Sequence, residues 1–309
     1  MPDTPGQPVS VVPAGSPPAS AAVGVPAAVP APMPERARDD ATVLRLWLDG
    51  RSPHTARAYG ADARAFLEHA GKPLRAVTLG DVQAYAAAVA HLAPASRARK
   101  VGAVKSLLGF AHRLGYLAFN VGGAMRLPPI KARLAERIVD EAAVHRLLFL
   151  EPAPRNHALL RLLYLGGLRI SEACGLTWRD LAARDDAGQV TVFGKGGKTR
   201  AVLLQPGLWR ELVALRGDAP NGAPVFRSRR GGHLTPKAVH EAVKAAGRRA
   251  GLPAGVSAHW LRHAHASHAL DRGAPIHLVQ ATLGHASVAT TGKYLHARPN
   301  DSSGRYLAG

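Results

Sequence analysis

The sequence has 309 residues and a mass of 32.4 kDa, and its 40 Lys and Arg residues against 21 Asp and Glu residues give a formal net charge of +19. This excess, with a sequence pI near 11.1, excludes an ordinary acidic enzyme as the default and indicates a polyanionic partner. Hydrophobic residues make up 47% of the chain, which allows packed cores and excludes global disorder. The single cysteine, Cys174, excludes an intramolecular disulfide and a cysteine-rich zinc site, and it suits a reducing compartment.

Residues 1–38 are rich in Pro and Ala, and we predict a disordered tail because the prolines leave no room for a helix. The tail has no basic start, and prolines interrupt its apolar stretches, so it does not resemble a signal peptide. No apolar run in the chain reaches the ~20 residues that a membrane helix needs. We therefore expect a cytoplasmic protein with no membrane partner.

Residues 39–130 predict a helical domain with a net charge of +6. An apolar face begins at residues 43–48, and Ser52-Pro53 has the form of an N-cap followed by proline at the first helical position. Thr78 precedes another predicted helix, and a longer helix is expected from Ser96 to His112. The polar face of this last helix carries four basic residues: Arg97, Arg99, Lys100 and Lys105.

Residues 131–309 predict a second domain, with a net charge of +13, that is mainly α with a small β-sheet. Asp140 is a candidate N-cap, and a helix from His157 to Leu165 should stop at two glycines. Two strands, 189–193 and 199–204, flank the glycine-rich loop at 194–198. Further helices are expected after Thr235-Pro236 and at residues 259–270, 275–283 and 289–294.

Three local patterns favour binding of a phosphate group. The glycine-rich loop lacks P-loop spacing and joins two strands, so Lys195 and Lys198 lie at a hairpin tip and could reach into a groove. Arg169 comes just before a helix that Ser171 could cap and whose positive end Glu172 complements. Alone, each is also consistent with a solvated lysine or an ion-paired arginine.

The third pattern is His259 and Arg262, which share a helix face and can both meet one phosphate. His259 and His263 also have the spacing of a zinc pair, but no glutamate base lies between them and no further ligand is obvious, so we predict no metal site. We interpret His263, His265 and His268 as surface or helix-packing residues. Three tyrosines are candidate nucleophiles, Tyr294 and the alternatives Tyr164 and Tyr306.

Together these residues form an ordered set: Arg169, Lys195, His259, Arg262, His285 and Tyr294. Four stretches contain them, 167–181 (GLRISEACGLTWRDL), 194–200 (GKGGKTR), 259–270 (HWLRHAHASHAL) and 283–294 (LGHASVATTGKY). With these motifs in this order, the sequence resembles the tyrosine recombinase (phage integrase) family, and within it the Xer-like bacterial site-specific recombinases. The resemblance covers residues 39–298.

The resemblance implies an N-terminal helical core-binding domain that clamps DNA and a mixed α/β catalytic domain. It implies that Tyr294 attacks the scissile phosphate to form a 3′-phosphotyrosine, that Arg169 and Arg262 hold the non-bridging oxygens, and that Lys195 protonates the leaving 5′-oxygen. His259 and His285 would assist, and Glu172 would orient the site. Strands would be exchanged through a Holliday junction, without metal, ATP or another cofactor. We expect further DNA contacts from the four basic residues named above and from Lys198, Arg200, Arg227, Arg229 and Arg230.

The implied partners are double-stranded DNA and three further copies of the chain, a homo-tetramer on paired DNA sites, with or without a second recombinase. Two alternatives stay open, a type IB topoisomerase with the same tyrosine chemistry and a non-catalytic DNA-binding protein on this scaffold. The complete set of six residues argues against the second. The sequence departs from the family at His265, where relatives have an aromatic residue, and in the short tail after Tyr294, which leaves docking onto a neighbouring subunit open.

Overall fold

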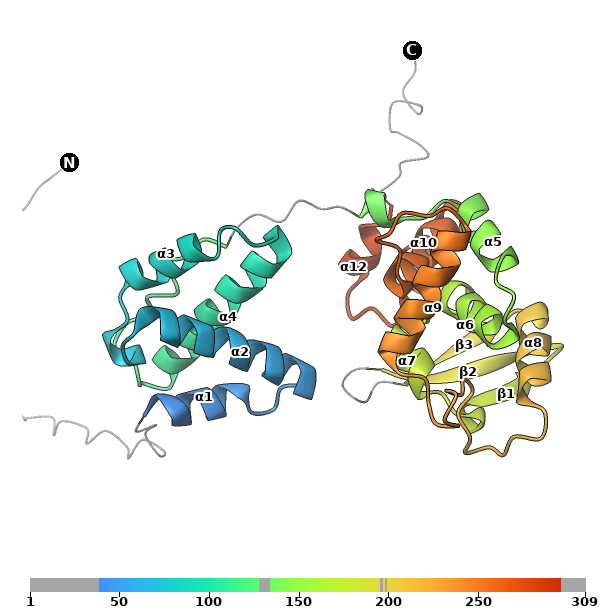
Figure 1. Cartoon of the computed structure of the whole chain (residues 1–309), viewed down its shortest axis with the longest axis horizontal. Helices are drawn as coiled ribbons and strands as arrows, with labels where there is room; N and C mark the ends of the chain where they lie inside the picture. Colours follow the sequence, from blue (N-terminus) through green and yellow to red (C-terminus); the bar gives the residue numbers. More distant parts are fainter. Residues whose placement is uncertain (1–38, 128–133, 195–196, 198, 296–309) are drawn as a thin grey trace, which may run out of the picture. The chain divides into compact units, whose positions relative to one another are not determined.

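The computed structural model describes residues 39–127, 134–194, 197 and 199–295. The chain divides into two compact units, residues 1–130 and 131–309. The prediction of a mainly helical protein with one small sheet is confirmed (Figure 1). Among the helices of the described ranges, none is long and apolar enough to cross a membrane. The predicted tail at 1–38 and the predicted linker around Pro128 and Pro129 lie outside these ranges.

The first unit consists of four helices and one 3-10 turn: α1 (Asp40–Leu48), α2 (Pro53–Ala70), η1 (Leu74–Ala76), α3 (Leu79–Ala88) and α4 (Pro94–Arg113). The predicted caps are confirmed, since the Ser52 side chain accepts from the backbone N–H of Thr55 and Thr78 forms a capping box with Asp81. Helices α1, α2 and α4 pack together around one core that includes Trp47, Phe66, Leu107 and Leu108 (Figure 1).

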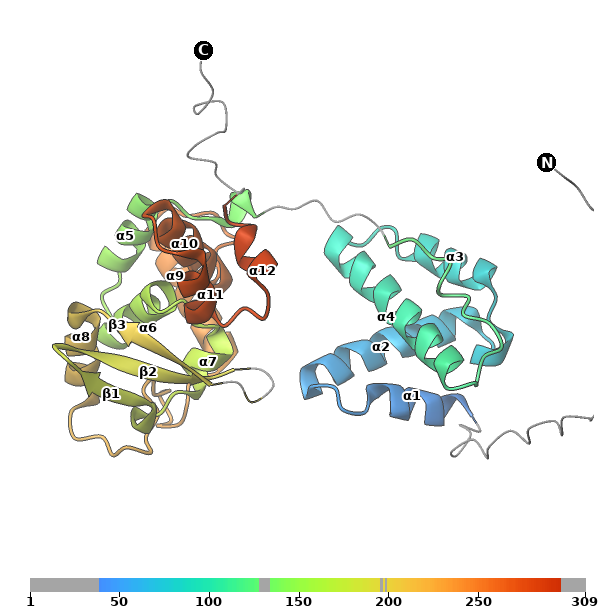
Figure 2. The same cartoon turned by 180° about the vertical axis from the view of Figure 1, so that it is seen from behind.

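The second unit begins with η2 (Ala135–Arg137), α5 (Glu141–Phe149), α6 (Pro154–Leu165) and α7 (Ile170–Gly175). After η3 (Trp178–Asp180) comes the antiparallel sheet of β1 (Leu181–Arg184), β2 (Ala187–Phe193) and β3 (Thr199–Leu204), in the order β1-β2-β3 (Figure 2). The remaining helices are α8 (Pro206–Arg216), α9 (Pro236–Arg249), α10 (Ala258–Asp271), α11 (Ile276–Leu283) and α12 (Val288–Gly292).

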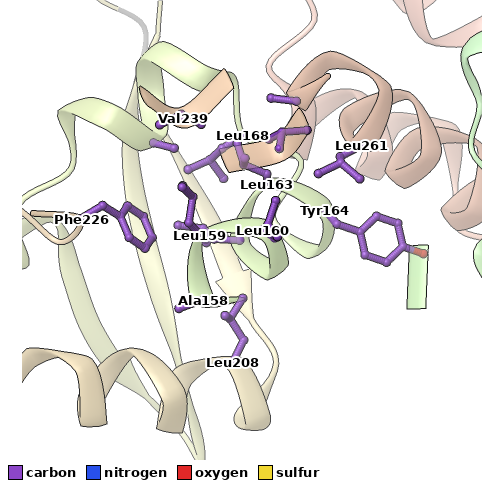
Figure 3. Close-up of a cluster of buried hydrophobic side chains, with 14 of the residues drawn as sticks. Ala158, Leu159, Leu160, Leu163, Tyr164, Leu168, Leu208, Phe226, Val239 and Leu261 are labelled. Carbon is purple, nitrogen blue, oxygen red and sulfur yellow. The ribbon is translucent and has the colours of Figure 1, made fainter. Parts of the chain in front are cut away.

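Helix α6 lies in the middle of this second core. Its buried leucines Leu159, Leu160 and Leu163 pack among side chains from α8, α9 and α10, including Leu208, Val239 and Leu261 (Figure 3). Helix α6 contacts α8 on one side and α10 on another, and α8 in turn lies against β2. This packing fixes the end of α6, and with it the loop that leads to Arg169.

Several local predictions were wrong. Strand β1 was missed because only Leu181 of its four residues is buried, so pairing with β2 and not alternation defines it. Helix α8 was also missed, although proline at its start and Leu208 and Leu212, which are four residues apart, were a signal. Ser171 does not cap α7; it lies inside the helix, because the carboxylate of Glu172 accepts from the backbone N–H of Arg169 and makes Arg169 the N-cap.

The end of the described chain differs from the prediction as well. Helix α12 stops at Gly292, so Tyr294 follows the helix in a turn whose backbone N–H donates to the carbonyl of Thr291. The tyrosine is therefore held by packing against other elements. Its ring belongs to a small cluster with Ile138, Ala266 and Leu283.

Candidate active site

Arg262 lies at the centre of the site. It projects from α10, is 2% exposed, and donates to the carbonyl oxygens of Gly167 and Leu283, the latter at 2.5 Å. Gly167 has φ +59°, and a Cβ there would lie 2.7 Å from Leu283, so the loop needs glycine at this position. Arg262 thus ties the loop between α6 and α7 to the end of α11, and burial lowers its pKa only to about 10, so it stays charged.

Arg169 also reaches the end of α11, from the loop that precedes α7. Its guanidinium donates to Glu172 at 2.8 Å and to the carbonyl of Gly284 at 3.3 Å. The two arginines therefore contact adjacent carbonyls, those of Leu283 and Gly284. The Arg169 side chain is 39% exposed, so its guanidinium can also meet a ligand from solvent.

Glu172 is the buried carboxylate that organises these cations. It accepts from Arg169 and, through both oxygens, from the guanidinium of Arg200 at 2.9 and 2.8 Å. Burial alone would raise the pKa of Glu172, but the hydrogen bonds from Arg200 and from the Arg169 backbone outweigh it and lower the pKa to about 2. Glu172 is therefore ionised at neutral pH.

Arg200 joins the sheet to this network. It lies on β3, its side chain is 12% exposed, and its Nε donates to the carbonyl of Thr282 at 2.7 Å. The expectation was a DNA contact. In this structure the guanidinium is occupied by Glu172 and by the end of α11, so it links the β2–β3 hairpin to Arg169.

Two histidines face the arginines. Nδ1 of His285 lies 2.9 Å from the hydroxyl of the buried Thr291. Burial, followed by the charges of Arg262, Arg169 and Arg200, lowers the pKa of His285 to about 4. Burial and the charge of Arg262 also lower the pKa of His259. These cations repel added protons, so we expect both rings to be neutral until an anion enters.

Tyr294 completes the cluster and is 6% exposed. Its hydroxyl lies 2.7 Å from Nδ1 of His263, and its ring is stacked parallel to that of His285 at a centroid distance of 6.4 Å. Burial raises the pKa of Tyr294, and the charge of Arg262 opposes this effect. Tyr294 is therefore a protonated phenol beside a cationic centre.

Two pockets meet at Arg169. One of about 540 Å³ is also lined by Arg200, Gly284 and His285, and the other, of about 360 Å³, by His259 and Arg262. Fixed guanidinium groups in such pockets can bind phosphate oxygens and stabilise charge that develops on them. Within the described residues, no three His, Cys, Asp or Glu side chains gather as a metal would require.

The structure brings together most of the predicted catalytic residues: Arg169, Glu172, His259, Arg262, His285 and Tyr294. The other candidates either lie outside the described residues or lie elsewhere in the second unit. Lys195, Lys198, Tyr306 and the tail after residue 295 lie outside the described residues. The alternative nucleophile Tyr164 is buried in the α6 core, where its hydroxyl is 2.9 Å from His268 and burial raises its pKa to about 12 (Figure 3). The departure at His265 is accommodated by a hydrogen bond of 2.8 Å from its Nδ1 to the carbonyl of Tyr164.

The other predicted DNA contacts are exposed to different degrees. Arg227, Arg229 and Arg230 are all exposed on a turn after Phe226. In the first unit, Arg99 and Lys100 of α4 pair with the buried Asp62, and Lys105 donates to the carbonyl of Met125 at 2.8 Å. The basic face of α4 therefore also holds its own unit together, which helical spacing alone did not indicate.

Sequence reasoning missed His263 as a site residue. It was interpreted as a packing histidine, yet it contacts the Tyr294 hydroxyl, and its ring lies 4.2 Å from that of His259, centroid to centroid. The available signal was the i, i+4 spacing of these two histidines, which places both rings on one face of α10 whether or not a metal binds there.

The chain matches two family models, the phage integrase family over residues 135–301 and the phage integrase N-terminal SAM-like domain over residues 44–115. It is 37% identical over 278 residues to tyrosine recombinase XerC of Rhodospirillum centenum, covering 80% of each chain. It is 33% identical over 258 residues to XerC of Xylella fastidiosa, covering 80% of this chain and 87% of that one.

Among solved structures, the fold is similar to that of the XerH site-specific recombinase in its pre-cleavage complex with difH DNA. The TM-score is 0.66 at 21% identity, over 86% of this chain and 82% of that one. The two family models, the extent of the XerC relatives and the arginine–tyrosine cluster agree. The chain belongs to the phage integrase family, and it is a site-specific tyrosine recombinase, an enzyme that cleaves and rejoins DNA.

Proposed function

We propose that Tyr294 is the nucleophile of this recombinase and forms a 3′-phosphotyrosine with the cleaved strand. The observation that carries the proposal is the convergence of Tyr294, Arg262 and Arg169 around the loop at Leu283 and Gly284. In the attack the phenolic oxygen bonds to phosphorus and the 5′-oxygen leaves. The link keeps the energy of the phosphodiester, so the reverse attack rejoins DNA without ATP, and two such exchanges pass through a Holliday junction.

The arginines supply the positive charge that the five-coordinate phosphate needs. Arg262 is rigid because two carbonyls hold it, and Arg169 is fixed by Glu172 while part of its guanidinium stays exposed. We assign them to the non-bridging oxygens, and we assign hydrogen bonds to the same phosphate to His259 and His285. Preorganised donors of this kind are worth ~10²–10³ in rate each.

We assign the acid for the leaving 5′-oxygen to Lys195, with Lys198 as the alternative on the same loop. Replacing the bridging 5′-oxygen by sulfur tests this choice, because a thiolate leaves without a proton from an acid. Lys195→Ala should be slow on ordinary DNA and restored on the sulfur substrate, whereas Lys198→Ala should resemble the wild type on both. The opposite pattern would transfer the role to Lys198.

Recombination requires four cleavages, so we propose a homo-tetramer on two paired DNA sites, with or without a second recombinase. Lambda integrase, which shares the fold, crystallised as a dimer on a core site, and its TM-score is 0.65 at 19% identity. Both units are basic, with net charges of +6 and +13, which favours their gripping one duplex. The DNA substrate implies a cytoplasmic, nucleoid-associated location.

The deciding experiment has two steps. Capture of covalent protein–DNA adducts across the genome first identifies the site, and a duplex of that sequence then serves for cleavage in EDTA. We expect the wild type to form the adduct at an undiminished rate in EDTA, and Tyr294→Phe to bind the duplex without forming it. An adduct that persists in Tyr294→Phe would move the nucleophile to Tyr164 or Tyr306, and a strict Mg²⁺ requirement would refute the charge assignment.

A further inference from the structure

His263 contacts the atom that reacts, and no role follows for it from the phosphate-binding set. Its Nδ1 lies 2.7 Å from the Tyr294 hydroxyl, a normal hydrogen-bond distance, and both residues are buried. The ring of His285 stacks against that of Tyr294, and its Nδ1 is hydrogen-bonded to the hydroxyl of Thr291. His263 is thus the histidine that the structure sets against the hydroxyl itself.

We propose that His263 is the general base that takes the proton of Tyr294 when the tyrosine attacks DNA. This inference rests on the proposed role of Tyr294. The Oη–P bond forms as the P–O5′ bond breaks, the phenolic proton passes to Nδ1 of His263, and the leaving 5′-oxygen takes its proton from the acid assigned to Lys195. In rejoining, His263 returns the proton to Tyr294, so no net proton is consumed.

The charges around His263 keep its ring neutral, with a free acceptor, before DNA binds. The groups that face it are His259 and Arg262 of α10, Arg137 of η2, His285 after α11 and Tyr294 after α12. Burial, and then His259, Arg137, Arg262 and His285, lower the pKa of His263 to about 4, so the ring is neutral at pH 7 and can accept a proton. With its ring proton on Nε2, Nδ1 accepts from the hydroxyl.

A bound DNA phosphate raises the pKa of His263. Its negative charge offsets the cations that lower the histidine pKa, so His263 becomes a stronger base when the substrate is bound. His263 also makes a T-shaped ring contact with His259, and His259 and Arg262 both line the pocket of about 360 Å³. A phosphate bound in that pocket therefore lies close to the groups that set the pKa of His263. Proton acceptance is thereby coupled to occupation of the phosphate site.

His263→Asn is the sharpest variant, because the asparagine side-chain oxygen can take the place of Nδ1 as an acceptor but is not basic. We expect single-turnover cleavage of the captured site to slow by ~10²-fold at pH 7, within the range for loss of a general base. Between pH 6 and 10 the wild-type rate should level off, while that of the variant should keep rising about tenfold per pH unit as Tyr294 ionises. The deficit should therefore shrink at high pH.

His265→Asn is the matched control, since His265 is on the same helix and also uses Nδ1 in a hydrogen bond, to Tyr164. Any deficit it causes should be the same at every pH. His263→Gln serves as a second variant. Because the slope with pH is read within each variant, a partial loss of folded protein does not change the outcome.

The bridging-sulfur substrate separates this base from the acid. It should restore Lys195→Ala and leave His263→Asn slow, because sulfur relieves the leaving group and not the attacking phenol. A pH-independent deficit in His263→Asn, a wild-type rate, or full restoration by sulfur would each overturn the proposal. Failure of the nucleophile assignment would be seen separately, as adducts formed by Tyr294→Phe.

Discussion

A buried carboxylate holds two cations in each compact unit, and the two carboxylates serve different ends. Asp62 of α2 is 2% exposed and pairs with Arg99 and Lys100 of α4, which joins two helices of one core. Glu172 of α7 pairs with Arg169 and Arg200, which joins a loop and a strand at the edge of a pocket. The same kind of ion pair joins two helices in one unit and holds an arginine at a pocket in the other.

This comparison predicts that the two acids can be separated by what their loss changes. The partners of Asp62 link α4 to α2 within the first unit, so their displacement should affect stability and not the chemical step. One of the two partners of Glu172 is Arg169, which we assign to the scissile phosphate. Misplacing such a group by ~1 Å can cost ~10²-fold in rate.

The largest expected effect is that of Glu172→Gln on cleavage. The amide cannot hold two guanidinium groups as the carboxylate does, so Arg169 and Arg200 both lose their anchor. We expect single-turnover cleavage at saturating DNA to fall ~10²–10³-fold with little change in DNA affinity. Unchanged cleavage would show that Gly284 alone positions Arg169.

The second prediction concerns the pH dependence of stability. The pKa of Glu172 is lowered to about 2 in the folded protein from an ordinary 4.5, so the stability that the ionised carboxylate contributes is complete above pH 4.5 and is lost as the pH falls through 2. The difference in unfolding free energy between wild type and Glu172→Gln should be about 3 kcal/mol at pH 6. Measured by denaturant titration, this difference between the two proteins should disappear as the pH approaches 2. A difference independent of pH would assign the loss to packing.

The sequence predicted most of the helices, and most of the residues that gather at the candidate site, because both have local signals. Ser52-Pro53 and Thr78 act within one turn, and Arg169, Arg262 and His285 lie in compact motifs. The contacts that were missed join distant parts of the chain, as Asp62 and Arg99 do across 37 residues and His263 and Tyr294 across 31. Spacing along one helix carries no information about such partners.

The third prediction uses Asp62→Asn. Loss of this buried acceptor should reduce the unfolding free energy of the first unit by ~1–3 kcal/mol, since Arg99 and Lys100 lose their partner but keep part of their solvation. Cleavage at saturating DNA should be unchanged, in contrast to Glu172→Gln. Asp49→Asn, an exposed acid at the end of α1, is the control and should change neither quantity. A slower chemical step in Asp62→Asn would refute the division of roles.

The smallest effect is expected from Arg99→Gln, and it tests whether the α4 face meets DNA at all. Reversing all four basic residues to Glu is a poor test, because carboxylates at 99 and 100 would oppose Asp62 and disturb the core. The Arg99 side chain is 43% exposed, and Lys100 still pairs with Asp62 when Arg99 is lost.

If Arg99 neutralises one phosphate, its removal should reduce the slope of log affinity against log salt by ~0.9, at a modest cost in affinity. Arg45→Gln removes the same charge from an exposed position on α1 and is the matched control. A slope lowered only in Arg99→Gln places α4 on the duplex. If both variants and the wild type have equal slopes, Arg99 contacts no phosphate and its only role is to pair with Asp62. The ion pairs of Asp62 would then stabilise the fold of the first unit, whereas those of Glu172 position Arg169 at a pocket of the second unit.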